Sequence, residues 1–371
     1  REIRRHSPVD VDAYDRYYHQ MAKWCRFIRP MLLRTPPDPT SFKFRDLDEL
    51  RWLGKKFFDL GPRDLHDFMK FFTVSVGEFL DEFFHSDLIK AHKAGSAVVG
   101  TNLGAMSPGT AYVLLHHYMG DVDGAVGAWG FPRGGMGAVS GALAGAVKEH
   151  GGEIRTNAGV DQIMVKNGKV TGVRLENGEE INADRVVSNL DARKTFLGMM
   201  DPKDAGEKVV KAAKRYKSRG SSGKLNIALN GVPEFTALPK GSELIKGDFH
   251  IVDNMEAYER GYDEWKDGKW STHPYLDLLI PTLTDPTMAP PGKHFMTCFV
   301  QYCPSRVEGK DWTPVLLKQF GDNVIDNIAK YSPNFKDLIE HVEIRSGQVI
   351  DNEIGLTEGN IFQGELSLNQ L

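Results

Sequence analysis

The sequence has few cysteines and no long apolar run, and each shortage excludes a class of protein. Only Cys25, Cys298 and Cys303 occur among 371 residues, and this odd, widely spaced set argues against a disulfide framework. We therefore expect an intracellular, reducing compartment. No stretch approaches the ~20 apolar residues of a membrane-spanning helix. No secretory signal is visible either.

Positively and negatively charged residues are nearly equal in number. Lysine and arginine number 46 against 50 aspartates and glutamates, which gives a formal net charge of −4 without a long run of either sign. This balance lacks the basic patch of nucleic-acid-binding proteins, so we expect no nucleic-acid partner. Hydrophobic residues make up 41% and charged residues 26%, which is typical of a globular protein, and the length allows two domains.

Catalytic motifs are scarce as well. The sequence has neither a G-x-S-x-G nucleophile elbow nor a G-x-x-x-x-G-K-[ST] phosphate loop. Glu82 and His85 have the E-x-x-H spacing of half a di-metal site, but no second such motif accompanies them, so we expect no metal. A globular chain of this kind is either non-catalytic or depends on a cofactor for its chemistry.

Glycine, by contrast, is abundant between Trp129 and Ile154, in the stretch WGFPRGGMGAVSGALAGAVKEHGGEI. The G-x-G-x-x-G fingerprint fails here, because Ser140 stands at its last position and no hydrophobic strand precedes it. The stretch instead predicts a helix whose first amides face outward and receive an anion or a flat ring with partial negative charge. Arg133 adds a positive charge just before it.

The body of this predicted helix has two faces. Small residues recur every four positions, and a second set is expected to form a buried apolar stripe: Gly137, Gly141 and Gly145 on the first face, and Met136, Val139, Leu143 and Val147 on the second. A ligand at the helix start and tight packing without a ligand remain equal alternatives.

The rest of the chain divides into helical and strand-rich parts. Residues 1–125 are predicted to be mostly helical, with three amphipathic helices between 62 and 92 and a capping box at Ser75 and Glu78. Five phenylalanines of this part, which either line a hydrophobic tunnel or pack as a core, are Phe71, Phe72, Phe79, Phe83 and Phe84. We favour the core.

Residues 153–189 alternate with period two and predict a three-stranded antiparallel meander. Asn167-Gly168 and Asn177-Gly178 favour type I′ turns, and the third strand is expected to carry Ile181, Val186 and Val187. Residues 220–305 predict a second antiparallel sheet, and Thr313-Pro314 is expected to open a further helix.

At this point the motifs line up with a known family. The stretch PRGGMGAVSGALAGAVKEHGGEIRTNAGVDQIMVKNGKVTGVRLENGEEINADRVVSNLDA resembles the middle of the phytoene-desaturase-like FAD oxidoreductases of the amine-oxidase-type flavoprotein superfamily. SPGTAYVLLHHYMG, DPTMAPPGKH and GNIFQGELSLNQL narrow the resemblance to one branch. The resemblance extends over nearly the whole chain.

The resemblance implies an α+β or α/β fold. In such a fold a glutathione-reductase-type FAD domain, here partial, is interleaved with a mixed sheet-plus-helix substrate domain. Residues 126–195 and 346–371 correspond to the FAD domain, and 1–125 and 196–345 to the substrate domain. The family's opening G-x-G-x-x-G and closing glycine-rich flavin segment have no counterpart, and the chain begins with Arg1, so we expect a fragment.

Carried over residue by residue, the resemblance implies a set of cofactor contacts made largely by backbone. Arg133 would be the cation nearest the ring or substrate, with no other catalytic side chain implied. The residues implied in FAD binding are Gly134, Gly135 and Met136 beside the ring, Val160 at the adenine, and Ser188, Asn189 and Asp191 at a strand end.

The implied function is an FAD-dependent oxidoreductase of the dehydrogenase or desaturase type, acting on a hydrophobic small molecule by hydride transfer to flavin. The alternative is a catalytically silent flavoprotein-fold scaffold with a protein partner. A third hypothesis is a peripheral membrane-surface binder using the helices at 62–92. The expected compartment is the cytoplasm in a prokaryote and the mitochondrial matrix in a eukaryote.

Overall fold

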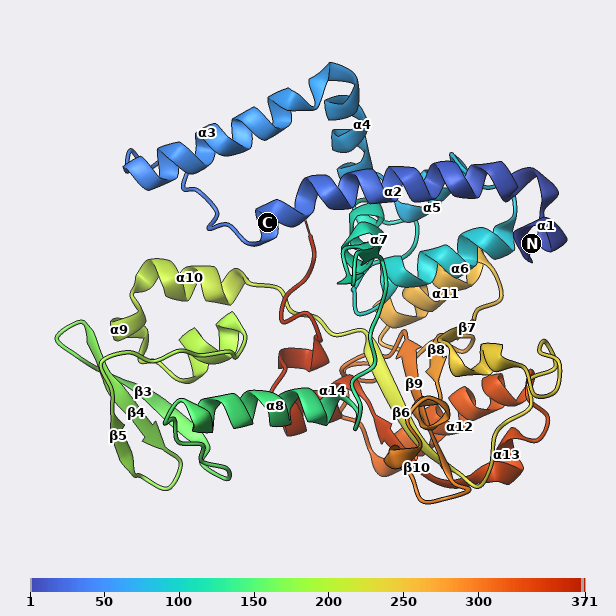
Figure 1. Ribbon diagram of the computed structural model, residues 1–371. Helices are drawn as coiled ribbons and strands as arrows, with labels where there is room; N and C mark the ends of the chain where they lie inside the picture. The colour runs from blue at the N-terminus through green and yellow to red at the C-terminus, as the bar shows by residue number, and fades with distance from the viewer. Residues whose placement is uncertain (1, 368–369, 371) are drawn as a thin grey trace. The chain divides into compact units, whose positions relative to one another are not determined.

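Helices dominate the first 120 residues of the chain, whose computed structural model describes residues 2–367 and 370 (Figure 1). The chain divides into two compact units, of which unit 1 comprises Arg1–Val99, Leu103–Gly130 and Val252–Arg260. The elements of unit 1 are α1 (Glu2–His6), η1 (Pro8–Asp10), α2 (Val11–Leu32), α3 (Phe44–Asp59), α4 (Gly61–Thr73), α5 (Val76–Asp81), α6 (Asp87–Val98), α7 (Thr110–Tyr118), β1 (Asp121–Val122) and β2 (Ala125–Val126).

The three helices predicted between residues 62 and 92 are present as α4, α5 and α6. The capping box is also confirmed: the Ser75 hydroxyl accepts from the Glu78 amide while the Glu78 carboxylate accepts from the Ser75 amide. Phe71, Phe79 and Phe84 are buried, and the Phe71 and Phe79 ring centroids lie 4.8 Å apart. The aromatic residues of this unit therefore pack as a core, as favoured from the sequence.

A long-range carboxylate contact holds the helices of unit 1 together. Asp10 is fully buried, and its two oxygens accept hydrogen bonds of 2.9 Å from the amides of His85 and Ser86. The start of α2 is thereby tied to the loop between α5 and α6. These amides lower the pKa of Asp10 despite its burial, which acts in the opposite direction.

Unit 2 comprises Gly100–Asn102, Phe131–Ile251 and Gly261–Leu371. Its helices are α8 (Met136–Glu149), η2 (Lys194–Gly198), α9 (Pro202–Ala205), α10 (Glu207–Arg215), η3 (Glu243–Lys246), η4 (Pro281–Leu283), η5 (Pro286–Met288), α12 (Pro314–Ala329), α13 (Phe335–Leu338), α14 (Gly347–Ile354) and η6 (Thr357–Gly359), and α11 (Met255–Lys266) is shared between the units. Its strands are β3 (Val160–Lys166), β4 (Lys169–Leu175), β5 (Glu180–Asn182), β6 (Ser222–Leu229), β7 (Phe249–Ile251), β8 (Tyr275–Leu279), β9 (His294–Gln301) and β10 (Ile339–Arg345).

The larger sheet of unit 2 has five antiparallel strands in the order β10-β6-β9-β8-β7 (Figure 1). Alternate residues of its strands face a core that α12 and α13 cover: Leu225 and Ile227 of β6 join Phe320 and Val324 of α12 there. Thr313 caps α12 as predicted, by accepting from the Leu316 amide. The strand pattern of residues 220–305 correctly predicted β6 to β9, whereas β10 lies beyond that range and was not predicted.

The smaller sheet is the predicted meander of β3, β4 and β5. Asn167 and Gly168 both have positive φ, as a type I′ turn requires, whereas only the glycine of Asn177-Gly178 does, so the second type I′ prediction is wrong. The third strand was also placed too far along the chain. It ends at Asn182, and Val187 lies outside any strand with 95% of its surface exposed.

A buried amide fixes the short segment Gly100–Asn102 within unit 2. The Gln301 side chain is fully buried and donates to the Thr101 carbonyl at 2.8 Å and to the Ser221 hydroxyl at 3.0 Å. Its oxygen accepts from the Gly100 amide and from the Ser222 hydroxyl. Each polar atom of this side chain is thus paired within the protein, which a buried amide requires.

The fold class is α+β, in agreement with the sequence prediction. The assignment of 126–195 and 346–371 to one FAD-binding domain stays a prediction, and positions 368, 369 and 371 lie outside the described residues. None of the described helices combines the length and the apolar character that crossing a bilayer requires.

Candidate functional site

The turn before α8 is built from two glycines in unusual conformations. Gly134 and Gly135 have φ values of 82° and 77°, which glycine adopts without the strain that a side chain would cause. The Gly134 amide donates to Oδ2 of Asp285 at 2.6 Å, and the Gly135 amide donates to the Pro132 carbonyl at 3.0 Å. The expectation that the amides of this turn all face outward is therefore wrong for these two glycines.

No side chain caps the first turn of α8 itself, whose residues are all described. Gly135 occupies the N-cap position without a side-chain hydrogen bond, and Met136, the first helical residue, is 73% exposed. The Ala138 amide donates to the Gly135 carbonyl at 3.0 Å, so the amides of this first turn that remain able to contact a ligand are those of Met136 and Gly137.

The charges around this turn decide which kind of ligand it suits. The Gly134 amide, the Thr287 hydroxyl and the nearby Arg133 all lower the pKa of Asp285, which is ionised at neutral pH. A phosphate at the helix start would face this carboxylate and be repelled, and the charge of Arg133 is already directed partly at Asp285. The arrangement therefore favours an uncharged ring system over a phosphate.

The stripe of α8 that the sequence predicted to be buried is exposed. Among its 14 residues, all of which are described, none is buried. Leu143 is 65% exposed, and Val139 and Val147 are 43% and 42% exposed. The prediction failed because helical periodicity identifies an apolar face but does not supply the surface that covers it.

The glycine face of α8 is equally open. A Cβ atom built on Gly137, Gly141 or Gly145 meets no atom of the described residues within 4 Å. At Gly135 a Cβ would instead meet the Met288 methyl group at 3.0 Å. The helix thus presents a smooth surface that another backbone or a flat ring can approach closely.

Val160 opens β3, where its backbone pairs with Leu175 of β4. A cavity of 410 Å³ adjoins this strand start and is lined by Arg155, Thr156, Asn157, Ala158, Gly159, Leu175, Glu176, Asn177 and Glu179. Its walls are mostly polar residues, together with Ala158, Gly159 and Leu175. The predicted adenine contact of the Val160 backbone remains a prediction, and a hollow does adjoin that position.

Ser188, Asn189 and Asp191 lie between β5 and η2. The Ser188 hydroxyl is 2.8 Å from that of Thr195. Asp191 is only 3% exposed, and its carboxylate accepts from the Lys194 amide and from the amide and hydroxyl of Thr357. The Asp191 side chain therefore ties η6 to this segment, which leaves the backbone of residues 188–191 as the predicted cofactor contact.

Lys224 is a functional candidate that the sequence analysis missed. It lies on β6 between core residues, so its side chain points to the sheet face opposite the α12-covered core. Although Lys224 is exposed, its pKa is lowered by partial desolvation of the ammonium and by the neighbouring Arg345. Strand alternation could have placed Lys224 on this face, but not beside Arg345 of β10.

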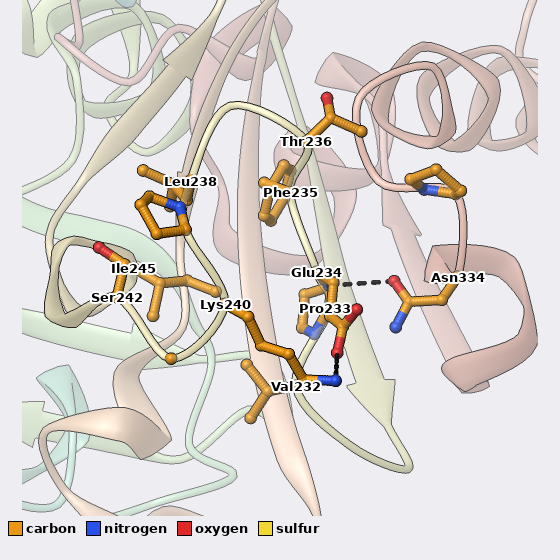
Figure 2. Close-up of a pocket in the computed structure, with 13 residues that line it drawn as sticks. Val232, Pro233, Glu234, Phe235, Thr236, Leu238, Lys240, Ser242, Ile245 and Asn334 are labelled. Carbon is orange, nitrogen blue, oxygen red and sulfur yellow. Dashed lines mark hydrogen bonds and ion pairs between the residues drawn. The ribbon is translucent and has the colours of Figure 1, made fainter.

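A second hollow, shown in Figure 2, has a volume of 630 Å³ and follows β6. Apolar side chains such as Phe235, Leu238 and Ile245 line it, and an exposed ion pair of 3.1 Å joins Lys240 to Glu234. The Glu234 amide donates to the Asn334 side chain. None of the residues predicted to bind the cofactor lines this hollow.

Comparisons with known proteins bear on these features. The family model described as "Flavin containing amine oxidoreductase" matches residues 33–257. The pyridine nucleotide-disulfide oxidoreductase domain-containing protein 2 of Rattus norvegicus is 33% identical over 390 residues, covering 100% of this chain and 66% of that protein. The chain therefore spans about two thirds of the length of this relative.

Two more distant relatives are an isomerase named for prolycopene and a desaturase named for phytoene. The chloroplastic prolycopene isomerase of Daucus carota is 26% identical over 302 residues, covering 78% of this chain and 44% of that protein. The lycopene-forming phytoene desaturase of Pseudescherichia vulneris is 28% identical over 258 residues, covering 69% and 47%. These matches confirm the family resemblance that the glycine-rich segment indicated. They also confirm the branch of the family, which includes the rat protein, and the expected flavin cofactor.

Proposed function

The chain belongs to the flavin containing amine oxidoreductase family, and from this premise we propose that the complete protein is an FAD-dependent oxidoreductase acting on a hydrophobic small molecule. The proposed reaction is a dehydrogenation with hydride transfer from a substrate C–H bond to the flavin. Support comes from the family, from the desaturase among the relatives, and from the scarcity of catalytic side-chain motifs in the sequence.

The observation that carries the proposal is the uncapped, glycine-lined start of α8 with its exposed apolar stripe. An apolar stripe that faces solvent along a whole helix is unfavourable, at ~25 cal/mol per Å² of apolar surface left in water. A ring system or a packed chain segment over Met136 and Leu143 would remove this cost. A carboxylate at the turn, together with open glycines along the helix, suits a flat neutral ring better than an anion.

The residues present thus fit a flavin in shape and charge. The proposed contacts are the Gly134–Met136 turn at the ring, the Val160 backbone at the adenine, and the backbone of residues 188–191. A bound flavin would supply the hydride acceptor, which takes up two electrons and one proton. This chain's own side chains do not provide such an acceptor.

The chain's residues contribute orientation and shielding from water. Met136 and Leu143 supply apolar surface that excludes water from a bound ring. Arg133 remains the cation nearest the glycine turn, with its charge shared with Asp285.

The alternative function is a catalytically silent interaction protein. The exposed stripe of α8 also favours this alternative, because a partner protein can cover an apolar helix face as well as a ring can. Isolation of a stoichiometric partner, together with no flavin reduction by any substrate, would support it.

The test is the visible spectrum of the complete protein that contains this chain. We expect flavin absorbance after purification or after incubation with FAD, and bleaching when an oxidisable apolar substrate is added without oxygen. Leu143→Glu should lower the bound flavin, whereas Leu33→Glu, at a residue 93% exposed in unit 1, should not. Absence of flavin absorbance at saturating FAD would refute the proposal.

A further inference from the structure

Three potential metal ligands converge on one face of the larger sheet. β7 and β8 pair so that His250 lies directly opposite Asp277. Asp248 precedes His250 by two residues, and side chains two apart in an extended strand point to the same side. Leu276 and Leu278, which flank Asp277, face the core, so the three polar side chains lie on the opposite face.

The distances among these groups match those within a metal site. Nε2 of His250 lies 3.2 Å from Oδ2 of Asp248 and 3.8 Å from Oδ2 of Asp277. One ligand atom from each of the three residues lies within 4.8 Å of the other two. Ligands bound to zinc at ~2.0–2.2 Å in a tetrahedron stand roughly 3.3–3.6 Å from one another. The three atoms can therefore surround one ion with little movement.

The charges of these groups are compatible with a bound cation. Two carboxylates contact each other and face a single imidazole nitrogen, which can donate only one proton. A metal ion or a shared proton between the two carboxylates would reduce their mutual repulsion.

An outer group orients the most buried of the carboxylates. The Tyr275 hydroxyl donates a hydrogen bond to Asp277, and the Tyr275 and His250 rings meet edge to face with centroids 5.3 Å apart. Tyr275 is only 3% exposed, so its position is fixed by packing. Hydrogen bonds from such outer groups to ligands are typical of metal sites and hold the ligand geometry.

We propose that Asp248, His250 and Asp277 bind a divalent first-row transition-metal ion, with zinc as the best fit. An imidazole with two carboxylates suits zinc or manganese better than magnesium or calcium, which prefer oxygen ligands throughout. The ion would join the three-residue edge strand β7 to β8. This site is independent of the flavin, and nothing in the sequence motifs indicated it.

The test measures zinc binding to the untagged, complete protein after treatment with a chelator and dialysis. Calorimetric titration with zinc chloride should give one equivalent per chain, and cobalt(II) should produce the visible ligand-field absorption of a site with nitrogen and oxygen ligands. His250→Ala and Asp277→Asn should each weaken zinc binding by more than tenfold, because loss of even an outer-shell partner costs ~10–100-fold.

Matched controls separate the site from general effects. His273→Ala removes an exposed histidine two residues before β8 and should leave zinc binding unchanged. Tyr275→Phe keeps all three ligands and should weaken binding without abolishing it. If a ligand variant fails to fold, the cobalt spectrum of the unaltered protein decides whether a metal site with nitrogen and oxygen ligands is present. No stoichiometric zinc binding, or equal binding by the His250→Ala variant, would overturn the proposal in favour of a proton shared by the two carboxyls.

Discussion

The amide of Gly134 donates a 2.6 Å hydrogen bond to Asp285, a residue 151 positions further along the chain. The glycine turn before α8 is therefore held by the loop that contains η5. The same carboxylate also accepts from the amide and hydroxyl of Thr287. One side chain thus orders both the turn and the loop, and its loss should affect both.

We predict that Asp285→Ala loosens this turn and lowers the flavin content of the complete protein. Asp285→Asn keeps a side-chain oxygen for the Gly134 amide and should retain more flavin than the alanine variant. Flavin content per protein, measured from visible absorbance after gel filtration, checks the order of the variants. Equal flavin content in Asp285→Ala and the unaltered protein would show that the turn does not contact the cofactor.

Gly141→Ala is predicted to have opposite effects in two contexts. In this chain alone it should raise the free energy of unfolding by about 0.4–1 kcal/mol, because alanine favours a helix and a Cβ meets no atom there. In the complete protein it should reduce flavin binding if a ring or backbone lies against the glycine face.

Gly54→Ala provides the matched control for this substitution. Gly54 lies inside α3, and a Cβ there also has open space around it. It should stabilise the chain by a similar amount and leave flavin binding unchanged. Urea titrations together with FAD titrations measure both quantities, and a Gly141→Ala protein that binds FAD normally would count against contact at this face.

Gln301→Leu is predicted to destabilise unit 2. The substitution leaves the Gly100 amide and the Ser222 hydroxyl without their buried partner, and each unsatisfied group costs ~1–3 kcal/mol. We expect a total loss on the order of 2–5 kcal/mol in the free energy of unfolding. Thermal and urea denaturation measure it. A loss below about 0.5 kcal/mol, typical of surface changes, would contradict the role of this amide.

Asp10 is predicted to make unit 1 sensitive to acid. Because its pKa is lowered in the folded chain, its contribution to stability is fully present above the ordinary carboxyl value of 3.8 and is lost as the pH falls below that value. Asp10→Asn should therefore be less stable than the unaltered chain at neutral pH, and the difference should shrink in acid. Melting temperatures measured from pH 2.5 to 7 check this, with the exposed Asp15→Asn as control.

Local signals in the sequence predicted the local structure well. The Ser75–Glu78 box and the Asn167-Gly168 turn are determined by residues within one turn of one another, and both formed as expected. The strand β10 was missed because its outer residues are charged, so its alternating pattern of Val342 and Ile344 was weak. Its pairing with β6 became evident only from the sheet.

The parts of the candidate sites that could not be predicted depend on distant partners. Asp248 and Asp277 lie 29 positions apart, and only the register of β7 against β8 brings them together. The contact between Gly134 and Asp285 likewise follows from tertiary packing. For α8 the periodicity correctly gave the apolar stripe, but burial depends on a covering surface, which no pattern within the helix specifies.

The strand order of the larger sheet has a consequence for synthesis. β6 is an interior strand, yet its neighbours β9 and β10 follow it by many residues, and β10 ends only at Arg345. At ~5–20 residues per second, β6 waits on the order of 10 s with both hydrogen-bonding edges unsatisfied. Unpaired strand edges invite association with other chains, so the nascent protein should depend on chaperones during this interval.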